Sequence, residues 1–440
     1  MRLSLVQCVV PLCACLASHL GAQPGLTYTS PNPRETLLTV THVHVPSKVY
    51  HTDRDISVWL PSGLPRTGVR YAVLVFPDAE EKVQFRSALA NVQFLIDRQL
   101  VPPIMVLGVP FLKNRMHELT PPATGATAQH APAAGGADET LHFLADELLP
   151  WADAHYPTLP TRILVGHSAG GLLALHAIAT RPDLFRVLIA LSPALYWNDG
   201  AFSNEVAARI ASDTRHERTL FVNSGGLENG PLETPIDSAT TVFALQLRSR
   251  LDSAHNTTVR FERREYPSDA HDVTPLSGLI DGLRMAFSPT VVPIDSVFVQ
   301  LTQNHTQDSS TIVHTTRELQ SRYTTAATSL GIPAPFPEGP LDALGSYALS
   351  VKQTGLAITL FRENRDRYPH SANAHESLGE ALAAAGDTSH AVEELRTAVS
   401  LGQAEMRTTD LIRVWANDRD VIAAARGQLQ QLHQGGPGGS

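Results

Sequence analysis

The sequence reads Gly166-His167-Ser168-Ala169-Gly170 between an apolar run at residues 162–165 and a helical run at residues 172–178. A buried strand, a tight turn and a helix are the setting of a nucleophile elbow. Glycines at both ends permit a turn in which a Cβ would clash, and the turn holds the Ser168 hydroxyl clear of its neighbours. The amide of Ala169 then becomes one donor to a developing oxyanion. The stretch therefore predicts a nucleophilic serine.

On either side of this stretch, strand-like apolar runs alternate with helical runs from about residue 37 to residue 290. Such alternation predicts an α/β fold with a mostly parallel sheet covered by helices on both faces. A sheet-covering helix is predicted over residues 138–156, with Asp138 available as its N-cap, and a polar loop over residues 120–136. The predicted strands are residues 39–45, 56–60, 72–76, 104–109, 162–165, 187–191, 220–223 and 259–266.

The segment 1–22 has the composition of a secretory signal peptide. Arg2 gives a basic start, an apolar stretch follows, and Gly21-Ala22 gives a small-residue end. An exported protein, periplasmic or secreted, is therefore predicted, without a permanent membrane span. A lipoprotein cut ahead of Cys15 is the alternative.

All three cysteines, Cys8, Cys13 and Cys15, fall within that segment. The mature chain would then have neither disulfides nor a thiol nucleophile, nor any cysteine-ligated metal. Its formal charge would be near −10, compared with −9 for the whole chain, because Arg2 is removed. An acidic surface argues against nucleic acid or an anionic membrane face as partner. No cofactor is predicted.

The serine needs a base to take its proton and an acid to orient that base, in the chain order serine, acid, histidine. His271 lies in a loop after the last predicted strand and is the predicted base. Glu228, in a glycine-rich turn after the strand at 220–223, is the favoured acid, and Asp237 is the alternative. His167 is expected to pack or hydrogen-bond within the elbow.

Two further loops are expected to line the site. The second oxyanion donor is assigned to the backbone N–H of Ala79, which follows the strand at 72–76. Arg115, after the next strand, is either a ligand for an anionic or polar acyl group or a solvated charge. His42 and His44 alternate on an extended segment and have no third ligand nearby, so they are interpreted as one face of an edge strand, not a metal site.

At 440 residues the chain exceeds what one core normally covers, so two folding units are expected. A Pro-rich linker at 332–340 precedes a 34-residue repeat, the tetratricopeptide period, in which Leu344-Gly345 recurs as Leu378-Gly379. Ala357 and Phe361 recur as Ala391 and Leu395, and helices at about 310–330 and 410–432 would cap the stack. The predicted segments are a signal peptide (1–22), an α/β domain (23–290), a helical connector and linker (291–340), helical repeats (341–433) and a disordered tail (434–440).

Several motifs together resemble one known family. They are Ser47-Lys48-Val49-Tyr50, residues 54–61, Asn114-Arg115, residues 135–138, Leu148-Leu149-Pro150, Tyr156, residues 166–171 and Ser192-Pro193-Ala194-Leu195-Tyr196-Trp197. From about His44 to Phe287 the chain is similar to the esterase D-like branch of the α/β-hydrolases. That branch includes feruloyl esterases, S-formylglutathione hydrolase, siderophore esterases and mycolyltransferases. Residues 294–398 look like the C-terminal helical region of bacterial siderophore-esterase-like members.

The resemblance implies an α/β-hydrolase fold and a catalytic pair at Ser168 and His271, with a third acid that varies within the branch. Many relatives have Leu-Asp-Gly where this chain has Phe76-Pro77-Asp78-Ala79, and the missing glycine leaves the shape of the second oxyanion donor open.

The sequence thus predicts an exported serine hydrolase that cleaves a small carboxylic ester through an acyl-enzyme. Acyl transfer to an alcohol by the same residues is one alternative. The other is a non-catalytic protein that binds a protein or peptide partner through its repeats.

Overall fold

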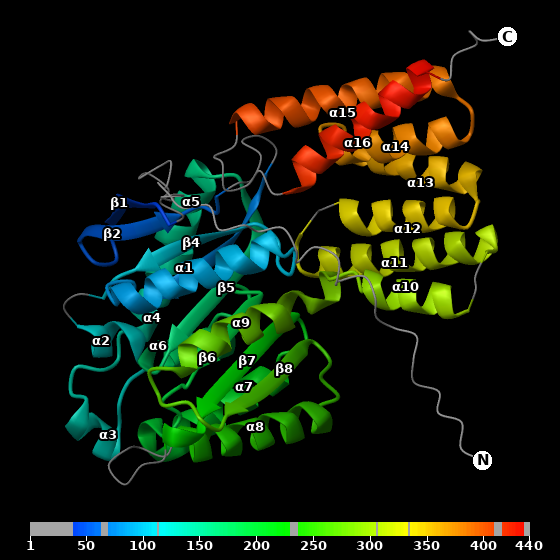
Figure 1. Cartoon of the computed structure of the whole chain (residues 1–440). Coiled ribbons are helices and arrows are strands. Elements are labelled where there is room, and N and C mark those ends of the chain that lie inside the picture. The colour runs from blue at the N-terminus through cyan, green and yellow to red at the C-terminus, as the bar shows by residue number, and fades with distance from the viewer. Residues whose placement is uncertain are drawn as a thin grey trace, which may run out of the picture. The chain divides into compact units, whose positions relative to one another are not determined.

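The chain folds around an eight-stranded sheet with the order β1-β2-β4-β3-β5-β6-β7-β8 (Figure 1). β1 and β2 pair antiparallel, as do β2 and β4, and all other neighbours are parallel. Each predicted strand is present. They are β1 (Val40–Ser47), β2 (Thr52–Trp59), β3 (Tyr71–Pro77), β4 (Ile104–Val109), β5 (Thr158–His167), β6 (Val187–Leu191), β7 (Arg218–Gly225) and β8 (Val259–Tyr266).

The structure is a computed structural model that describes residues 38–62, 69–111, 114–228, 236–304, 307–332, 335–408 and 416–434. The predicted signal peptide, the alternative lipoprotein site and the three cysteines lie outside these residues. So do residues 333–334 of the predicted linker and all but the first residue of the predicted tail. No helix within the described ranges is both long and apolar enough to cross a bilayer.

Helices cover both faces of the sheet, as predicted for an α/β fold (Figure 1). α1 and α9 pack on one face, and α4 to α8 on the other. The helices are α1 (Lys82–Asp97), α2 (Arg115–Leu119), α3 (Gly125–His130), α4 (Ala137–Phe143), α5 (Leu149–His155), α6 (Ala169–Thr180), α7 (Ala201–Ser212), α8 (Ile236–Ser253), α9 (Thr274–Phe287), α10 (Ile294–Gln303), α11 (Ser309–Ser329), α12 (Glu338–Ser350), α13 (Thr354–Arg367), α14 (Ala372–Ala384), α15 (Thr388–Thr408) and α16 (Ala416–Gln434).

The parallel strands place the loops that follow them at one edge of the sheet. β5 is central, and its residues Ile163, Leu164 and Val165 are fully buried between the helical layers. In the ladders, His167 pairs with Leu191, and Leu191 pairs with Asn223. The segments that follow β5, β6 and β7 therefore begin side by side at the carboxyl edge of the sheet, where ligands bind in such folds.

The helix predicted over residues 138–156 is interrupted. It consists of α4, a π-helical turn at Leu144–Leu148, and α5. Pro150 lies in the first turn of α5, and its ring and missing N–H prevent a regular hydrogen bond to the preceding turn. The N-cap is Gly136, so the cap predicted at Asp138 is wrong. The Asp138 carboxylate instead accepts a hydrogen bond of 2.6 Å from His176 on α6.

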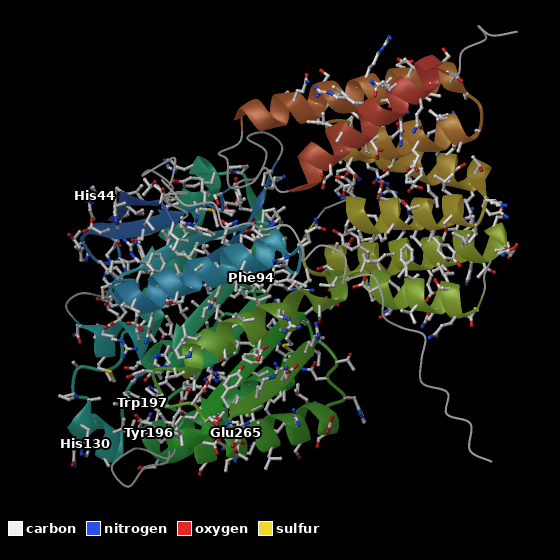
Figure 2. The ribbon with its side chains drawn as sticks, viewed as in Figure 1. His44, Phe94, His130, Tyr196, Trp197 and Glu265 are labelled. Carbon is white, nitrogen blue, oxygen red and sulfur yellow. The ribbon has the colours of Figure 1, made fainter. Side chains whose placement is uncertain are left out.

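A short helix, α3, lies within the segment predicted to be a loop. It packs beside the turn at Trp197–Gly200, and Figure 2 shows His130 near Trp197. The side chain of Asn198 in that turn bonds the segment around α3 twice, accepting from the amide of Thr124 at 2.8 Å and donating to the carbonyl of Pro122 at 3.0 Å. Asn198 is far from this segment in the chain, which is why composition alone predicted a loop.

The C-terminal helices repeat with the period found in the sequence. α12 begins at Glu338 and α14 at Ala372, while α13 begins at Thr354 and α15 at Thr388, so both pairs of helices start one repeat apart. A Cβ on Gly345 would lie 2.6 Å from the Phe361 ring, and one on Gly379 would lie 2.7 Å from Leu395. Small residues thus permit the close approach of the paired helices. The tetratricopeptide assignment itself stays a prediction, and α12 begins inside the predicted linker.

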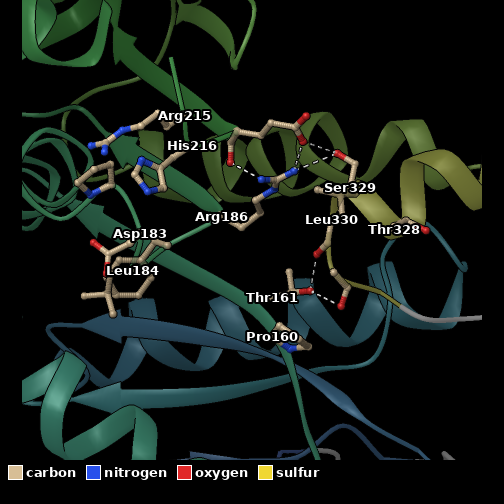
Figure 3. A pocket seen from close by; sticks show the side chains of 14 residues that line it. Pro160, Thr161, Asp183, Leu184, Arg186, Arg215, His216, Thr328, Ser329 and Leu330 are labelled. Atoms are coloured by element: carbon tan, nitrogen blue, oxygen red, sulfur yellow. Dashed lines mark hydrogen bonds and ion pairs between the residues drawn. The ribbon is translucent and has the colours of Figure 1, made fainter. Parts of the chain in front are cut away.

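The end of α11 is attached at the amino edge of the sheet, opposite the elbow. A cleft there has a volume of about 510 Å³ and is lined by residues 160–161, 182–186, 215–217 and 328–331. Figure 3 shows the side chains that line it. Thr161 Oγ1 donates to the carbonyl of Leu330 at 2.6 Å, and Arg186 pairs with Glu217 and donates to Ser329 Oγ at 3.0 Å. These contacts attach the end of α11 to the edge of the sheet that lies opposite Ser168, because Thr161 is near the start of β5 and Ser168 follows the end of β5.

Several acidic residues lie on α12 and α14. One of them, Glu376, makes the stability of the folded protein depend on pH. Burial, with help from the nearby charges of Glu380 and Asp342, raises the pKa of Glu376 to about 7. The folded state then holds a proton that the unfolded state releases near pH 4.5, so stability falls as pH rises from about 4.5 to 7.

We therefore expect Glu376→Gln to stabilise the protein above pH 7. The carboxyl is only partly buried, which weakens the effect, so the gain is on the order of 1–2 kcal/mol at pH 8 and vanishes near pH 4.5. Thermal melts at the two pH values measure it. The matched change Glu393→Gln, at an exposed glutamate of α15, should alter neither melt. Equal melting temperatures for Glu376→Gln and wild type at pH 8 would contradict this account.

Candidate active site

Ser168 occupies the turn between β5 and α6, where the sequence predicts an elbow. Its φ of 58° and ψ of −113° lie outside the regions that residues with a side chain prefer, at a cost of about 1–3 kcal/mol. The Ser168 amide donates to the carbonyl of Leu191 at 2.9 Å, which fixes the turn against β6. Within the described residues the Ser168 hydroxyl has no hydrogen-bond partner, so its oxygen is free to react.

The glycines of the elbow are required by close backbone contacts. A Cβ on Gly166 would lie 2.0 Å from the carbonyl oxygen of Gly170, and one on Gly171 would lie 2.9 Å from Cα of Pro193. Neither contact can be relieved by moving a flexible side chain, because both neighbours are backbone atoms. The first turn of α6 therefore packs directly under the serine, as the glycine pattern predicts.

His271 follows β8 in the loop that leads into α9. Its Nδ1 lies 3.4 Å from Oε1 of Glu228 and has no hydrogen-bond partner within the described ranges. The His271 ring also contacts the ring of His167, with 4.4 Å between centroids. Because Nδ1 is directed at the carboxylate, Nε2 is the nitrogen left to take a proton from a serine, as in a serine–histidine–acid triad.

Glu228 ends the short 3-10 turn that follows β7, and its side chain is 1% exposed. Its Oε1 accepts a hydrogen bond of 2.6 Å from Ser192 Oγ, and its Oε2 has no partner among the described residues. A buried carboxylate without a resident cation favours positive charge on a neighbouring imidazole. The arrangement is suited to stabilising the imidazolium that forms when a base accepts a proton.

The alternative acid, Asp237, is held elsewhere. Its carboxylate, in the first turn of α8, pairs with Arg263 at 2.5 Å and accepts from Ser224 Oγ at 2.6 Å. Among the contacts of the described residues, none joins Asp237 to His271. The structure thus brings Glu228, and not Asp237, next to the predicted base.

The two predicted oxyanion donors differ in their surroundings. The amide of Ala169 is the first of α6 and has no backbone acceptor in the described part of the chain. The amide of Ala79 already donates to the carbonyl of Val109, although the N···O distance of 3.4 Å makes this bond weak. Asp78 before it has a φ of 60°, a conformation that glycine adopts more readily. The loop adopts this conformation although Asp78 has a side chain.

Arg115 lies at the amino end of α2 and is committed to an ion pair. Its Nε and Nη2 bind the two carboxylate oxygens of Asp78 at 2.6 and 2.8 Å, and Nη2 also donates to the carbonyl of His167 at 3.2 Å. The pair therefore bridges the loops after β3, β4 and β5. Nη1 has no such partner among the described residues, and the side chain is 37% exposed, so one face of the guanidinium is available to a ligand.

Sequence reasoning missed two hydroxyls beside the acid and the base. Ser192, directly after β6, donates to Glu228 and lies 2.7 Å from Thr274 Oγ1. Thr274 Oγ1 also lies 3.0 Å from the carbonyl of His271. The sequence places Ser192-Pro193 directly after a strand, and so at the carboxyl edge of the sheet. It does not indicate which side chain the Ser192 hydroxyl binds.

The two histidines of the N-terminal segment lie on the edge strand β1, as expected. His44 pairs with Asp55 at 2.5 Å and His42 lies 3.2 Å from Ser57 Oγ, both across the ladder with β2. Across the residues that the structure describes, no three histidine, cysteine or acidic side chains come together as metal ligands.

Comparison with known proteins gives one family match and several relatives. Residues 47–273 match the family described as "Putative esterase". The siderophore triacetylfusarinine C esterase of Aspergillus fumigatus is 37% identical over 124 residues, which are 27% of this chain and 41% of that relative. The ferri-bacillibactin esterase of Bacillus subtilis is 25% identical over 243 residues, covering 52% of this chain and 81% of that one. The chain thus aligns with less than half the length of the fungal relative.

A solved structure has the same architecture. The chain is similar to an IroE-like serine hydrolase from Shewanella oneidensis, with a TM-score of 0.59 and 22% identity. The match covers 75% of this chain and 100% of that one. At this identity the likeness establishes the fold, which is that of the α/β-hydrolases.

Proposed function

The chain belongs to the esterase family that matches residues 47–273, and from this premise we propose that it is a serine hydrolase of carboxylic esters. The observation that carries the proposal is the strained Ser168 at the carboxyl edge of the sheet, close to a histidine whose Nδ1 faces a buried carboxylate. Few arrangements other than nucleophilic catalysis explain why a serine is kept in this conformation beside such a pair.

In the proposed reaction, Ser168 Oγ attacks the ester carbonyl carbon while His271 Nε2 takes the hydroxyl proton. The tetrahedral intermediate collapses when His271 returns that proton to the departing alcohol, which leaves an acyl-serine. A water then attacks the acyl carbon, gives its proton to His271, and releases the acid as Ser168 regains its hydrogen. Glu228 stabilises the imidazolium that forms in both halves.

The developing oxyanion would be held by the Ala169 amide and by an amide of the Asp78–Ala79 segment. The first donor is supported by the free N–H at the start of α6, where the helix dipole also favours negative charge. For the second, the Asp78–Arg115 pair fixes the segment beside the elbow. A Cβ on Gly170 would lie 3.6 Å from Oδ2 of Asp78, which supports this closeness.

We assign the substrate to the siderophore class of esters, following the names of the matched relatives. Arg115 supports this assignment because its free Nη1 can bind an anionic or strongly polar acyl group. The signal-like composition of residues 1–22 supports action after export.

Product analysis tests the proposal. We expect the protein to hydrolyse ferric triacetylfusarinine C or ferri-bacillibactin in H2 18O, with one heavy oxygen in each new carboxylate. An aryl acetate is the reference substrate. Turnover of the aryl acetate alone would overturn the siderophore assignment. Transfer of the acyl group to an added alcohol, without labelled acid, would show an acyltransferase instead. No turnover of any ester by folded protein would favour the non-catalytic alternative.

A further inference from the structure

The carbonyl oxygen of His271 joins the nucleophile elbow to the loop of the base. Nε2 of His167 donates to this oxygen at 3.0 Å, although the two residues are far apart in the sequence. His167 is the residue directly before Ser168, and its own carbonyl accepts from Arg115. The His167 imidazole therefore links the turn that carries Ser168, the proposed proton donor, to the main chain of His271, the proposed acceptor.

The His271 carbonyl depends on such an outside donor. In a helical turn its partner would be the amide of Pro275, but proline has no N–H and cannot supply that hydrogen bond. Thr274 Oγ1 donates to this carbonyl at 3.0 Å, but it also lies 2.7 Å from Ser192 Oγ, whose own proton goes to Glu228. A hydroxyl has one proton, so Thr274 can serve the His271 carbonyl or the serine, but not both.

His167 is suited to this task because it stays neutral. Burial, with the smaller effects of the charges of His271 and Arg115, lowers the pKa of His167 to about 3, although the bond to the His271 carbonyl opposes this shift. A neutral imidazole has one N–H, and a carbonyl partner requires that it sit on Nε2. The donor thus remains in place while the neighbouring His271 ring gains and loses charge.

We propose that His167 is a positioning residue, whose Nε2–H holds the main chain of His271 so that the base ring stays aligned with Ser168 and Glu228. The inference rests on the proposed function. Proton transfer requires the donor and acceptor at a hydrogen-bond distance of about 2.6–3.2 Å, and a misplacement of about 1 Å costs about 100-fold in rate. His167 would therefore act on the chemical step through His271, without contact with the ester.

The test compares His167→Leu with His167→Gln in the full-length protein, using the aryl acetate. Gln presents an amide N–H at nearly the position of Nε2, whereas Leu has no donor. We expect Leu to lower kcat by about 10- to 100-fold with KM changed less than about threefold, and Gln to recover kcat to within about fivefold of wild type. The matched control His176→Leu, on α6 and paired with Asp138, should retain wild-type kcat.

A third variant covers the case in which Leu prevents folding. Asn has the same amide as Gln but is one methylene shorter, so its N–H falls short of the carbonyl. We expect His167→Asn to fold as His167→Gln does and to be about 10-fold slower. Equal kcat for Asn and Gln, or wild-type kcat for Leu, would overturn the inference. Active wild type separates this outcome from failure of the proposed function, since that failure would leave wild type inactive.

Discussion

Ser168→Ala is expected to lower kcat for ester hydrolysis by about 10⁴-fold or more, and to leave the fold unchanged. The substitution removes the attacking oxygen and keeps a Cβ, so the backbone at φ 58° experiences the same steric demand. The hydroxyl makes no hydrogen bond within the described residues, so no structural contact is lost. Residual activity would come from the oxyanion donors and from substrate binding alone.

Initial rates with an aryl acetate, together with thermal melts, measure this effect. The control is Ser203→Ala, which removes a buried serine of α7 whose hydroxyl donates to the carbonyl of Gly200 at 2.8 Å. It should retain wild-type kcat even if its melting temperature falls. A Ser168→Ala protein with more than about a hundredth of wild-type kcat would place the nucleophile elsewhere.

The second large effect is expected at the acid. Glu228→Gln should lower kcat by about 10³- to 10⁴-fold, because a neutral amide neither stabilises the imidazolium nor fixes the tautomer that places the proton on Nδ1. Gln keeps the size of the side chain and can still accept from Ser192, so the buried site should remain folded. The effect should fall on kcat and leave KM nearly unchanged, since Glu228 acts through His271.

Asp237→Asn is the matched control, since it makes the same chemical change at the other candidate acid. The substitution removes the negative charge that pairs with Arg263, so it should lower stability with little effect on kcat. The reverse result, with Asp237→Asn inactive and Glu228→Gln active, would assign the acid to Asp237. Full activity in both variants would mean that the histidine works without an acid.

Local pattern was sufficient for the strands of the sheet and for the tight turn at Ser168. The strands were recognisable because buried parallel strands are continuous apolar runs, and Gly166 and Gly170 marked the elbow because the turn excludes a Cβ. The spacing of Gly345 and Gly379 is the spacing of the helix pairs that pack there. The strand and turn signals each lie within one short segment, and the repeat is visible as a fixed spacing along the chain.

What the sequence could not indicate depends on pairing between distant segments. Arg115 was predicted as a ligand or a solvated charge, and the structure gives it Asp78, which lies on the loop after a different strand. His167 meets the carbonyl of His271, and α3 exists where a loop was predicted because Asn198 binds its flanks. These contacts depend on which strands are neighbours in the sheet, because neighbouring strands bring their loops together. The composition of a short segment does not indicate the strand order.

Labelling with a fluorophosphonate probe, followed by intact mass, tests the central claim most directly, because only an activated serine reacts. The account predicts one adduct per wild-type chain, mapped to Ser168, and none on Ser168→Ala. A folded wild-type protein that takes up no probe, or an equal adduct on Ser168→Ala, would contradict it.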